Sequence, residues 1–160
     1  MNYSDNQHKW VAIVSPKVPF ARLINAIVHL ALGQQAHRTH DSANFFHGYE
    51  GNDGRLVSTI SHWPVIVLKA DNGNQLRKLR TAALAAEIPC QAFLDTMLGS
   101  SAEDQMLRTK STDDANAEYF AVLLFGSADQ LQALTKKFSL FSPPATDCCE
   151  SRPFHYLDPH

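Results

Sequence analysis

Three polar side chains that can take part in chemistry lie close together in one otherwise apolar stretch. Phe20 to Gly33 reads FARLINAIVHLALG and carries Arg22, Asn25 and His29. At about 100° per residue on a helix, these three side chains lie within roughly 60° of one another and form one polar stripe. His29 can exchange protons near neutral pH, and Arg22 can hold a carboxylate or phosphate or stabilise an oxyanion.

A carboxylate and two serines are further candidates. Asp95 follows the apolar run CQAFL, at the carboxyl end of a predicted strand, where open α/β sheets place ligands. It can orient the imidazole of His29 or act as a base itself. These residues predict a cleft beside the first helix, with His29, Asp95 and Arg22 as catalytic candidates and Asn25, Ser100 and Ser101 as ligand-binding candidates.

A second interpretation of the polar stripe needs no site. Asn25 and His29 can instead hydrogen-bond backbone groups beneath a loop, as buried polar groups must. Apolar residues occupy nearly every other direction around this helix. Both interpretations therefore predict that Asn25 and His29 point the same way and are at least half buried.

Other kinds of site have little support in the sequence. There is no Gly-x-Ser-x-Gly nucleophile motif, no Walker loop and no Gly-x-Gly-x-x-Gly, so no nucleotide cofactor is predicted. HRTH, which contains His37 and His40, lacks a third ligand at a recognisable spacing, so no metal is predicted. RKLRT (residues 77–81) could contact phosphates, but a solvated helix face is the favoured interpretation, and Cys90 is interpreted as a small core residue in preference to a reactive thiol.

Length and composition predict one globular domain. The 160 residues are 44% hydrophobic and 19% charged, with a formal net charge of −2. We expect a single domain over 1–160, with a flexible tail at 1–8 and an irregular tail at 142–160. No apolar run reaches the roughly 20 residues of a membrane span, and the charge gives no global basic field for nucleic acid. The unpaired set Cys90, Cys148 and Cys149 favours a reducing, cytoplasmic compartment.

Alternating strand and helix patterns predict an α/β fold. We expect a small three-layer domain, with helices on both faces of an about four-stranded, mixed or largely parallel sheet. Between the first helix and the second strand lies a polar segment with a short hairpin around Asn52-Asp53-Gly54. Residues 96–116 are expected to form a mobile rim of the cleft. The expected strands span 10–14, 64–70, 90–94 and 119–126, and the expected helices span 20–36, 74–88 and 129–138.

Two families resemble this sequence. LINAIVHLALG and TMLGSS resemble a group of uncharacterised bacterial domains that have the fold of type-II peptidyl-tRNA hydrolases. More distantly, the chain resembles those hydrolases themselves over most of residues 9–141. WVAIVSPKVPFARLINAIVHLALG, AALAAEIPCQAFLD and YFAVLLFGSADQLQALTKKFSLF carry this resemblance, with His29 at the hydrolase histidine and Asp95 at the aspartate. The resemblance implies the hydrolase-like fold, a hydrolase activity and a homodimer.

Two functions stay open at this point. The first is binding of a small or anionic ligand in the cleft beside the first helix, without catalysis. The second is hydrolysis of an ester or amide by His29 and Asp95. The two turn lysines of the hydrolases fall on Phe20 and Arg22, and their helix glutamine falls on Ala26. These differences favour binding, and they argue against peptidyl-tRNA as the substrate.

Overall fold

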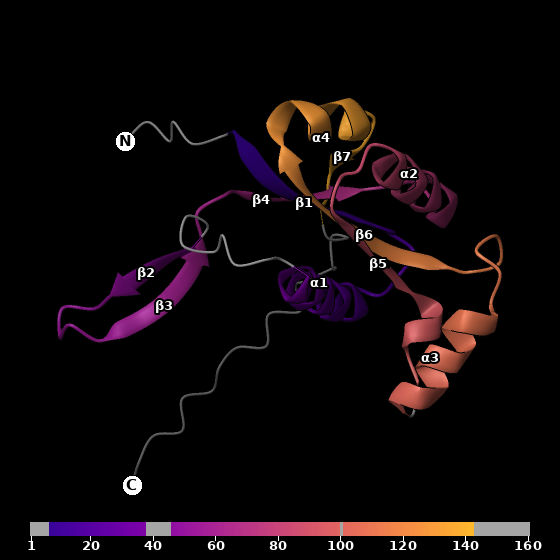
Figure 1. Cartoon of the computed structure of the whole chain (residues 1–160), viewed down its shortest axis with the longest axis horizontal. Helices are drawn as coiled ribbons and strands as arrows, with labels where there is room; N and C mark the ends of the chain where they lie inside the picture. The colour runs from indigo at the N-terminus through magenta and orange to yellow at the C-terminus, as the bar shows by residue number, and fades with distance from the viewer. Residues whose placement is uncertain (1–6, 38–45, 100, 143–160) are drawn as a thin grey trace, which may run out of the picture.

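In the described part of the chain, a five-stranded mixed sheet carries helices α1, α2 and α4 on its faces, and α3 lies beyond its end (Figure 1). The computed structural model describes residues 7–37, 46–99 and 101–142. The sheet order is β5-β6-β1-β4-β7, and a separate two-stranded hairpin is formed by β2 and β3. The strands are β1 (His8–Val14), β2 (Phe46–Glu50), β3 (Leu56–Ser61), β4 (Val65–Lys69), β5 (Cys90–Leu94), β6 (Tyr119–Ser127) and β7 (Ser139–Leu140). The helices are α1 (Phe20–Ala36), α2 (Gly73–Ala85), the short 3-10 turn η2 (Asp95–Met97), α3 (Ala102–Ser111) and α4 (Ala128–Thr135).

The central strand β1 is buried on both faces. Ala12 and Val14 belong to a core formed with α1, whereas Val11 and Ile13 belong to a second core formed with α2 and α4. Because successive side chains of a strand point to opposite faces, an apolar run without alternation is what two covered faces require. The three-layer arrangement predicted from the sequence is therefore observed.

The strand count and the strand directions differ from the prediction. The sheet has five strands, because the two-residue strand β7 pairs with β4 through Leu68 and Lys69. Only β1 and β4 run parallel, and the β1–β6, β5–β6 and β4–β7 pairs are antiparallel. The largely parallel alternative was therefore wrong and the mixed alternative was right. A local apolar pattern does not specify strand direction, because direction depends on the path of the connecting segments.

The segment predicted as a polar rim contains a regular helix. Residues 102–111 form α3, and the hydroxyl of Ser101 accepts a hydrogen bond from the Asp104 N–H at 3.2 Å and so caps its first turn. The guanidinium of Arg108 donates to the carbonyls of Leu98 (2.9 Å) and Asp95 (3.2 Å), which fastens α3 to η2. The apolar periodicity of this segment is weak, because none of the residues of α3 is buried.

The predicted hairpin projects from the body of the protein (Figure 1). Its strands pair from Phe46–Ser61 to Glu50–Leu56, and residues on both of its faces are exposed or only half-buried. Apolar side chains such as Tyr49, Leu56 and Val57 are therefore left in solvent.

Helix α1 has the predicted bounds but not the predicted burial. Only Leu23, Ala26, Leu30 and Gln34 are buried, so one face packs on the sheet and the others are open. Asn25 and His29 share one face as expected, but both are exposed. The prediction that they are half buried was wrong, because among the residues that the structure describes no further element covers this face of α1. No helix in the described part of the chain is long and apolar enough to cross a bilayer.

The packing of α2 gives a direct test of the core. Leu76 is fully buried, whereas Leu84 on the same helix is 52% exposed. We expect Leu76→Ala to lower the free energy of unfolding by about 2–5 kcal/mol, because it removes buried methyl groups and leaves a cavity. Leu84→Ala, the matched control, should change it by less than about 0.5 kcal/mol. Urea denaturation followed by circular dichroism measures both, and equal losses would contradict the assigned core.

Candidate functional site

Asn25 and His29 line a cavity of about 520 Å³ beside α1. The opposite wall is formed by β5 and by the segment that follows it, with Gln91, Phe93 and Gln105 among the lining residues. The His29 ring lies 6.1 Å from the Phe93 ring, centroid to centroid. The cavity thus carries one imidazole and three amide side chains, which can donate and accept hydrogen bonds without carrying a fixed charge.

The other predicted site residues do not line this cavity. The Asp95 carboxylate accepts a hydrogen bond from the Glu118 N–H at 3.0 Å, and the Asp95 N–H donates to the Glu118 carbonyl at 3.0 Å. Asp95 therefore joins the end of β5 to the start of β6. Arg22 is exposed on α1. Ser101 is exposed and caps α3, and Ser100 lies outside the described residues.

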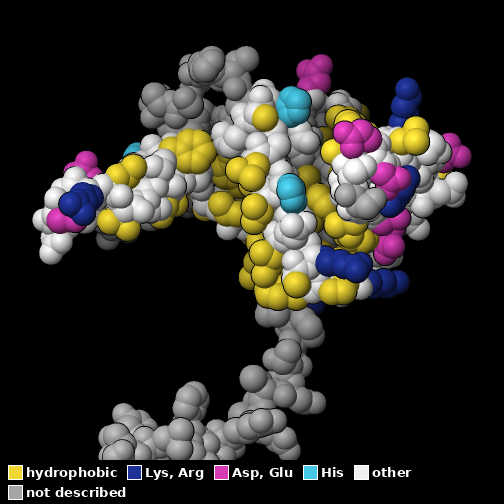
Figure 2. Space-filling model, turned by 90° about the horizontal axis from the view of Figure 1, so that it is seen from below, with side chains coloured by type: hydrophobic (Ala, Val, Ile, Leu, Met, Phe, Trp, Pro, Cys, Tyr) yellow, Lys and Arg dark blue, Asp and Glu magenta, His cyan; other side chains and the backbone are white. Residues whose placement is uncertain are grey.

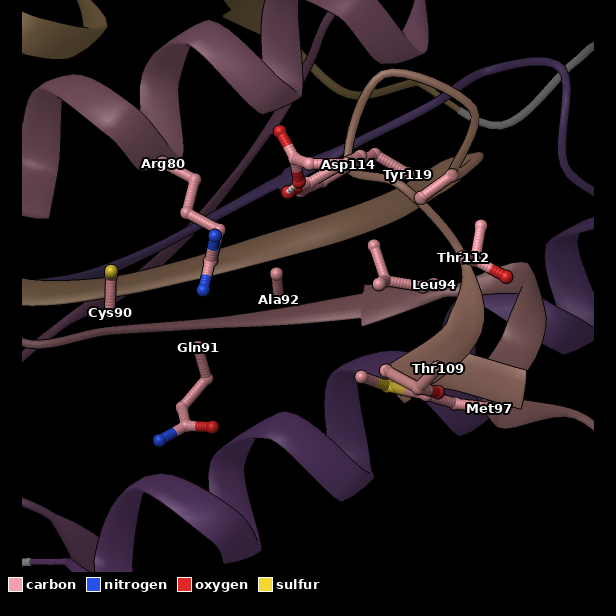
Figure 3. Close-up of a pocket in the computed structure, with 11 residues that line it drawn as sticks. Arg80, Cys90, Gln91, Ala92, Leu94, Met97, Thr109, Thr112, Asp114 and Tyr119 are labelled. Atoms are coloured by element: carbon pink, nitrogen blue, oxygen red, sulfur yellow. Dashed lines mark hydrogen bonds between the residues drawn. The ribbon is translucent and has the colours of Figure 1, made fainter. Parts of the chain in front are cut away.

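A second cavity, of about 430 Å³, lies on the other side of β5. Its lining includes Arg80 from α2, Cys90 from β5, and Asp114 and Tyr119 from the region that leads into β6. The Tyr119 hydroxyl donates to the Asp114 carboxylate at 2.6 Å. Figure 3 shows Arg80 reaching from α2 toward β5, with Gln91 directed away from it toward α1.

The two cavities meet along the edge strand β5. They share Gln91, Ala92 and Met97 as lining residues, and together we call them the β5 cleft. The hydrogen bond from the Phe125 N–H to the Pro89 carbonyl (3.1 Å) sets the pairing with β6. In an antiparallel ladder only alternate residues bond to the partner strand. Cys90 and Ala92 therefore direct their backbone N–H and carbonyl groups to the open outer edge of the sheet.

The charge of Arg80 influences two ionisable groups in the β5 cleft. Burial raises the pKa of the Cys90 thiol, and the nearby guanidinium of Arg80 partly opposes this rise. Burial also raises the pKa of Tyr119, and its hydrogen bond to Asp114 adds to the rise, while the charge of Arg80 lowers it. The charge of Arg80 therefore acts on both ionisable groups in its half of the cleft.

The described residues contain no group of three His, Cys, Asp or Glu side chains that could hold a metal ion. Of the two histidines in the HRTH motif, the structure describes only His37, which is exposed at the end of α1. His40 lies outside the described residues. A different histidine pair, His47 and His62, is joined by a hydrogen bond across the hairpin.

The sequence interpretation did not include Tyr119, and it treated RKLRT, which contains Arg80, only as a weaker candidate for phosphate contact. Arg80 belongs to RKLRT, which was interpreted as a solvated face, yet its side chain is only half-exposed, whereas the neighbouring Lys78 is exposed. The apolar spacing in the sequence does indicate the position of Arg80 on the helix. The residues of α2 that face the core are Leu76, Leu79 and Ala83. Arg80 follows Leu79 and therefore borders the buried face, where a long side chain can reach a neighbouring strand.

The comparisons with known proteins support the fold and leave the activity open. The chain belongs to the family described as "Protein of unknown function (DUF2000)", whose pattern matches residues 8–142. A solved structure of a protein of unknown function from Agrobacterium tumefaciens is similar, with a TM-score of 0.71 and 18% sequence identity. The similarity covers 85% of this chain and 98% of that protein. No curated protein matches the chain.

Thiol chemistry at Cys90 tests the electrostatics of the cleft. The thiolate is the reactive form, so its raised pKa predicts that alkylation continues to accelerate as the pH rises past 9.0. Arg80→Gln removes an influence that lowers the pKa and should move the midpoint to a still higher pH. The measurement is the rate of iodoacetamide labelling against pH, with Cys148 and Cys149 replaced by serine. A midpoint below 9.0, or one unmoved by Arg80→Gln, would contradict this environment.

Proposed function

We propose that this protein binds a small anionic ligand in the β5 cleft, beside the first helix. The observation that carries the proposal is Arg80, a half-buried cation that lines the half of the cleft between α2 and β5 (Figure 3). Among the described residues, the ion pairs within 4.0 Å involve Arg55 and Arg108, and Arg80 has no carboxylate partner at that distance. A guanidinium placed in this way is suited to a carboxylate or phosphate, which it can bind through two parallel hydrogen bonds.

Neutral groups along β5 and in the other half of the cleft complete the site, and Asp114 and Tyr119 line the same half as Arg80. Asn25, Gln91 and Gln105 offer amide donors, and the outer edge of β5 offers the N–H groups of Cys90 and Ala92. Each half of the cleft lies within the roughly 300–1,000 Å³ typical of small-molecule sites. The anion would therefore lie on Arg80, and the rest of the ligand would be held over the edge of β5 by hydrogen bonds.

Binding is better supported than catalysis. Hydrolysis by His29 and Asp95 requires the two side chains to act on one substrate, but Asp95 is bonded to the Glu118 amide and does not line the cavity of His29. His29 can still exchange protons with a ligand. A histidine that acts as a base is commonly oriented by a third group such as a carboxylate. In the hydrolase alternative, Asp95 does not supply that carboxylate to the imidazole of His29.

Titration with inorganic phosphate and with succinate tests the proposal. At constant ionic strength, both anions should raise the melting temperature in a saturable way, because a ligand that binds only the folded state stabilises it. Arg80→Gln should weaken the affinity by about 10-fold or more, since a hydrogen bond to a charged group is worth roughly 1.5–3 kcal/mol.

Lys78→Gln is the matched control for this titration. It removes one positive charge from an exposed position on the same helix and should leave the affinity within about 2-fold, because exposed charges are screened. Equal weakening in both variants would mean that the anions respond to the general charge of α2. An Arg80→Gln variant that binds as tightly as the natural chain would overturn the proposal.

His29→Ala and Asn25→Ala separate a ligand role from a structural one. Both side chains are exposed, so each change should alter the free energy of unfolding by no more than about 0.5 kcal/mol. Both line the cleft, so succinate affinity should fall by several-fold. Calorimetric titration beside urea denaturation measures the two quantities. Lost stability with unchanged affinity would show that these residues serve the fold alone.

A further inference from the structure

Two histidines face each other on the hairpin formed by β2 and β3. His47 lies on β2, and His62 follows the last residue of β3. The Nε2 atom of His47 and the Nδ1 atom of His62 share a hydrogen bond, and the two ring centroids are 4.8 Å apart. Because His47 pairs with Ile60, His62 is its diagonal neighbour on the same face of the ladder, a spacing that aromatic side chains can bridge.

This hydrogen bond is not needed to satisfy a buried polar group. His47 is exposed and His62 is half-buried, so both rings can reach water. A bond between two imidazoles requires one ring nitrogen to carry a proton and the other to offer a lone pair. When the donating ring carries its proton on its other nitrogen, both lone pairs point into the same space. Two imidazole lone pairs that converge in this way can chelate a metal ion.

The segment around His62 is fixed to the body of the protein. The Ser61 hydroxyl accepts hydrogen bonds from the Trp10 ring N–H (3.1 Å) and the Trp63 backbone N–H (3.2 Å), and it donates to the Trp63 carbonyl (3.1 Å). The His62 ring packs edge to face against the Trp63 ring, with centroids 4.4 Å apart. His47 is held by the β2–β3 ladder. Both ligands therefore stand on ordered backbone, which favours binding of an ion.

The surroundings of this histidine pair select the kind of ion. The charged residues of the hairpin, Glu50, Asp53 and Arg55, lie near its turn, and Figure 2 shows acidic and basic side chains gathered at its tip. Among the described residues, no carboxylate or thiol joins the two imidazoles in a group of three possible ligands. Nitrogen ligands without carboxylates suit Zn²⁺, Cu²⁺ or Ni²⁺, whereas Ca²⁺ and Mg²⁺ require oxygen ligands.

We infer that His47 and His62 form a binding site for a divalent transition metal ion, with Cu²⁺ bound more tightly than Zn²⁺. The ion replaces the hydrogen bond between the rings, each ring supplies one nitrogen, and water fills the remaining coordination positions. The His47 side chain is exposed, so a small rotation of its ring makes room for the ion.

The bound ion fastens the part of the fold that has the least packing. A two-stranded hairpin is marginally stable by itself in water, and β2 and β3 project from the body of the protein (Figure 1). Residues on both faces of the hairpin are exposed or half-buried. An ion held by one ligand from β2 and one from the end of β3 binds only the paired strands and therefore stabilises their pairing.

Calorimetric titration with copper and zinc chloride tests this inference. The chain is used without a histidine tag, and Cys148 and Cys149 are replaced by serine because thiolates also bind these ions. We expect one ion per chain for each metal, and no binding of Mg²⁺. Cu²⁺ should also quench the fluorescence of Trp63, whose ring packs on His62. His47→Gln and His62→Gln should each weaken the affinity by about 10-fold or more, since even groups behind a ligand contribute about 10–100-fold.

His37→Gln is the matched control, because His37 is exposed and belongs to the HRTH motif at the end of α1. It should leave the affinity within about 2-fold, since it removes no ligand of the site. A parent chain that binds neither ion at about 100 μM overturns the inference, and so do His47→Gln and His62→Gln variants that bind as tightly as their parent. Loss of binding in His37→Gln overturns it as well, because the ion would then lie at the HRTH motif.

Nuclear magnetic resonance of the parent chain gives a test that does not depend on how the variants fold. Small amounts of Cu²⁺ should broaden the ring proton signals of His47 and His62 before those of His29 and His37. Earlier broadening of any other histidine would contradict the assigned site. Neither His47 nor His62 lines the β5 cleft, so this inference stands or falls separately from anion binding at Arg80.

Discussion

The rest of the structure depends on the pairing of β1 with β6. Seven residue pairs join the two strands from His8–Ser127 to Val14–Ala121, and both strands are buried over most of their length. Because the side chains alternate across the sheet, this one ladder supplies apolar surface to both layers of helices. Helix α1 packs on one face and α2 with α4 on the other. The two halves of the β5 cleft lie where the sheet has an open edge between these layers.

The β5 cleft is a consequence of that edge. β5 pairs on one side with β6 and has no strand on its other side among the described residues. Its side chains alternate between the two faces, so Gln91 meets the residues of α1 and Cys90 meets those of α2. An edge strand between two helices of opposite layers thus brings together polar groups that are far apart in the sequence. Arg80 and His29 belong to one cleft for this reason.

Helix α1 presents polar and apolar side chains on neighbouring faces. The polar face of α1 carries Asn25 and His29, and the adjoining face carries Val28 and Leu32. This division answers why an apolar helix contains such polar side chains. One face packs on the sheet, one lines the β5 cleft, and one carries apolar side chains that are exposed among the described residues.

The sequence by itself determined the elements that depend on local chemistry. The bounds of α1 match because Pro19 precedes the helix and its apolar periodicity is long, and the bounds of β5 match because Pro89 and Asp95 enclose a short apolar run. The pairing of Asn25 with His29 on one face follows from helix geometry alone. Only the tertiary structure decided the strand directions, the exposure of α1, the position of Arg80 and the bonding of Asp95 to Glu118. These features depend on which segment lies opposite each side chain, and that is a property of the packed chain and not of any short stretch of it.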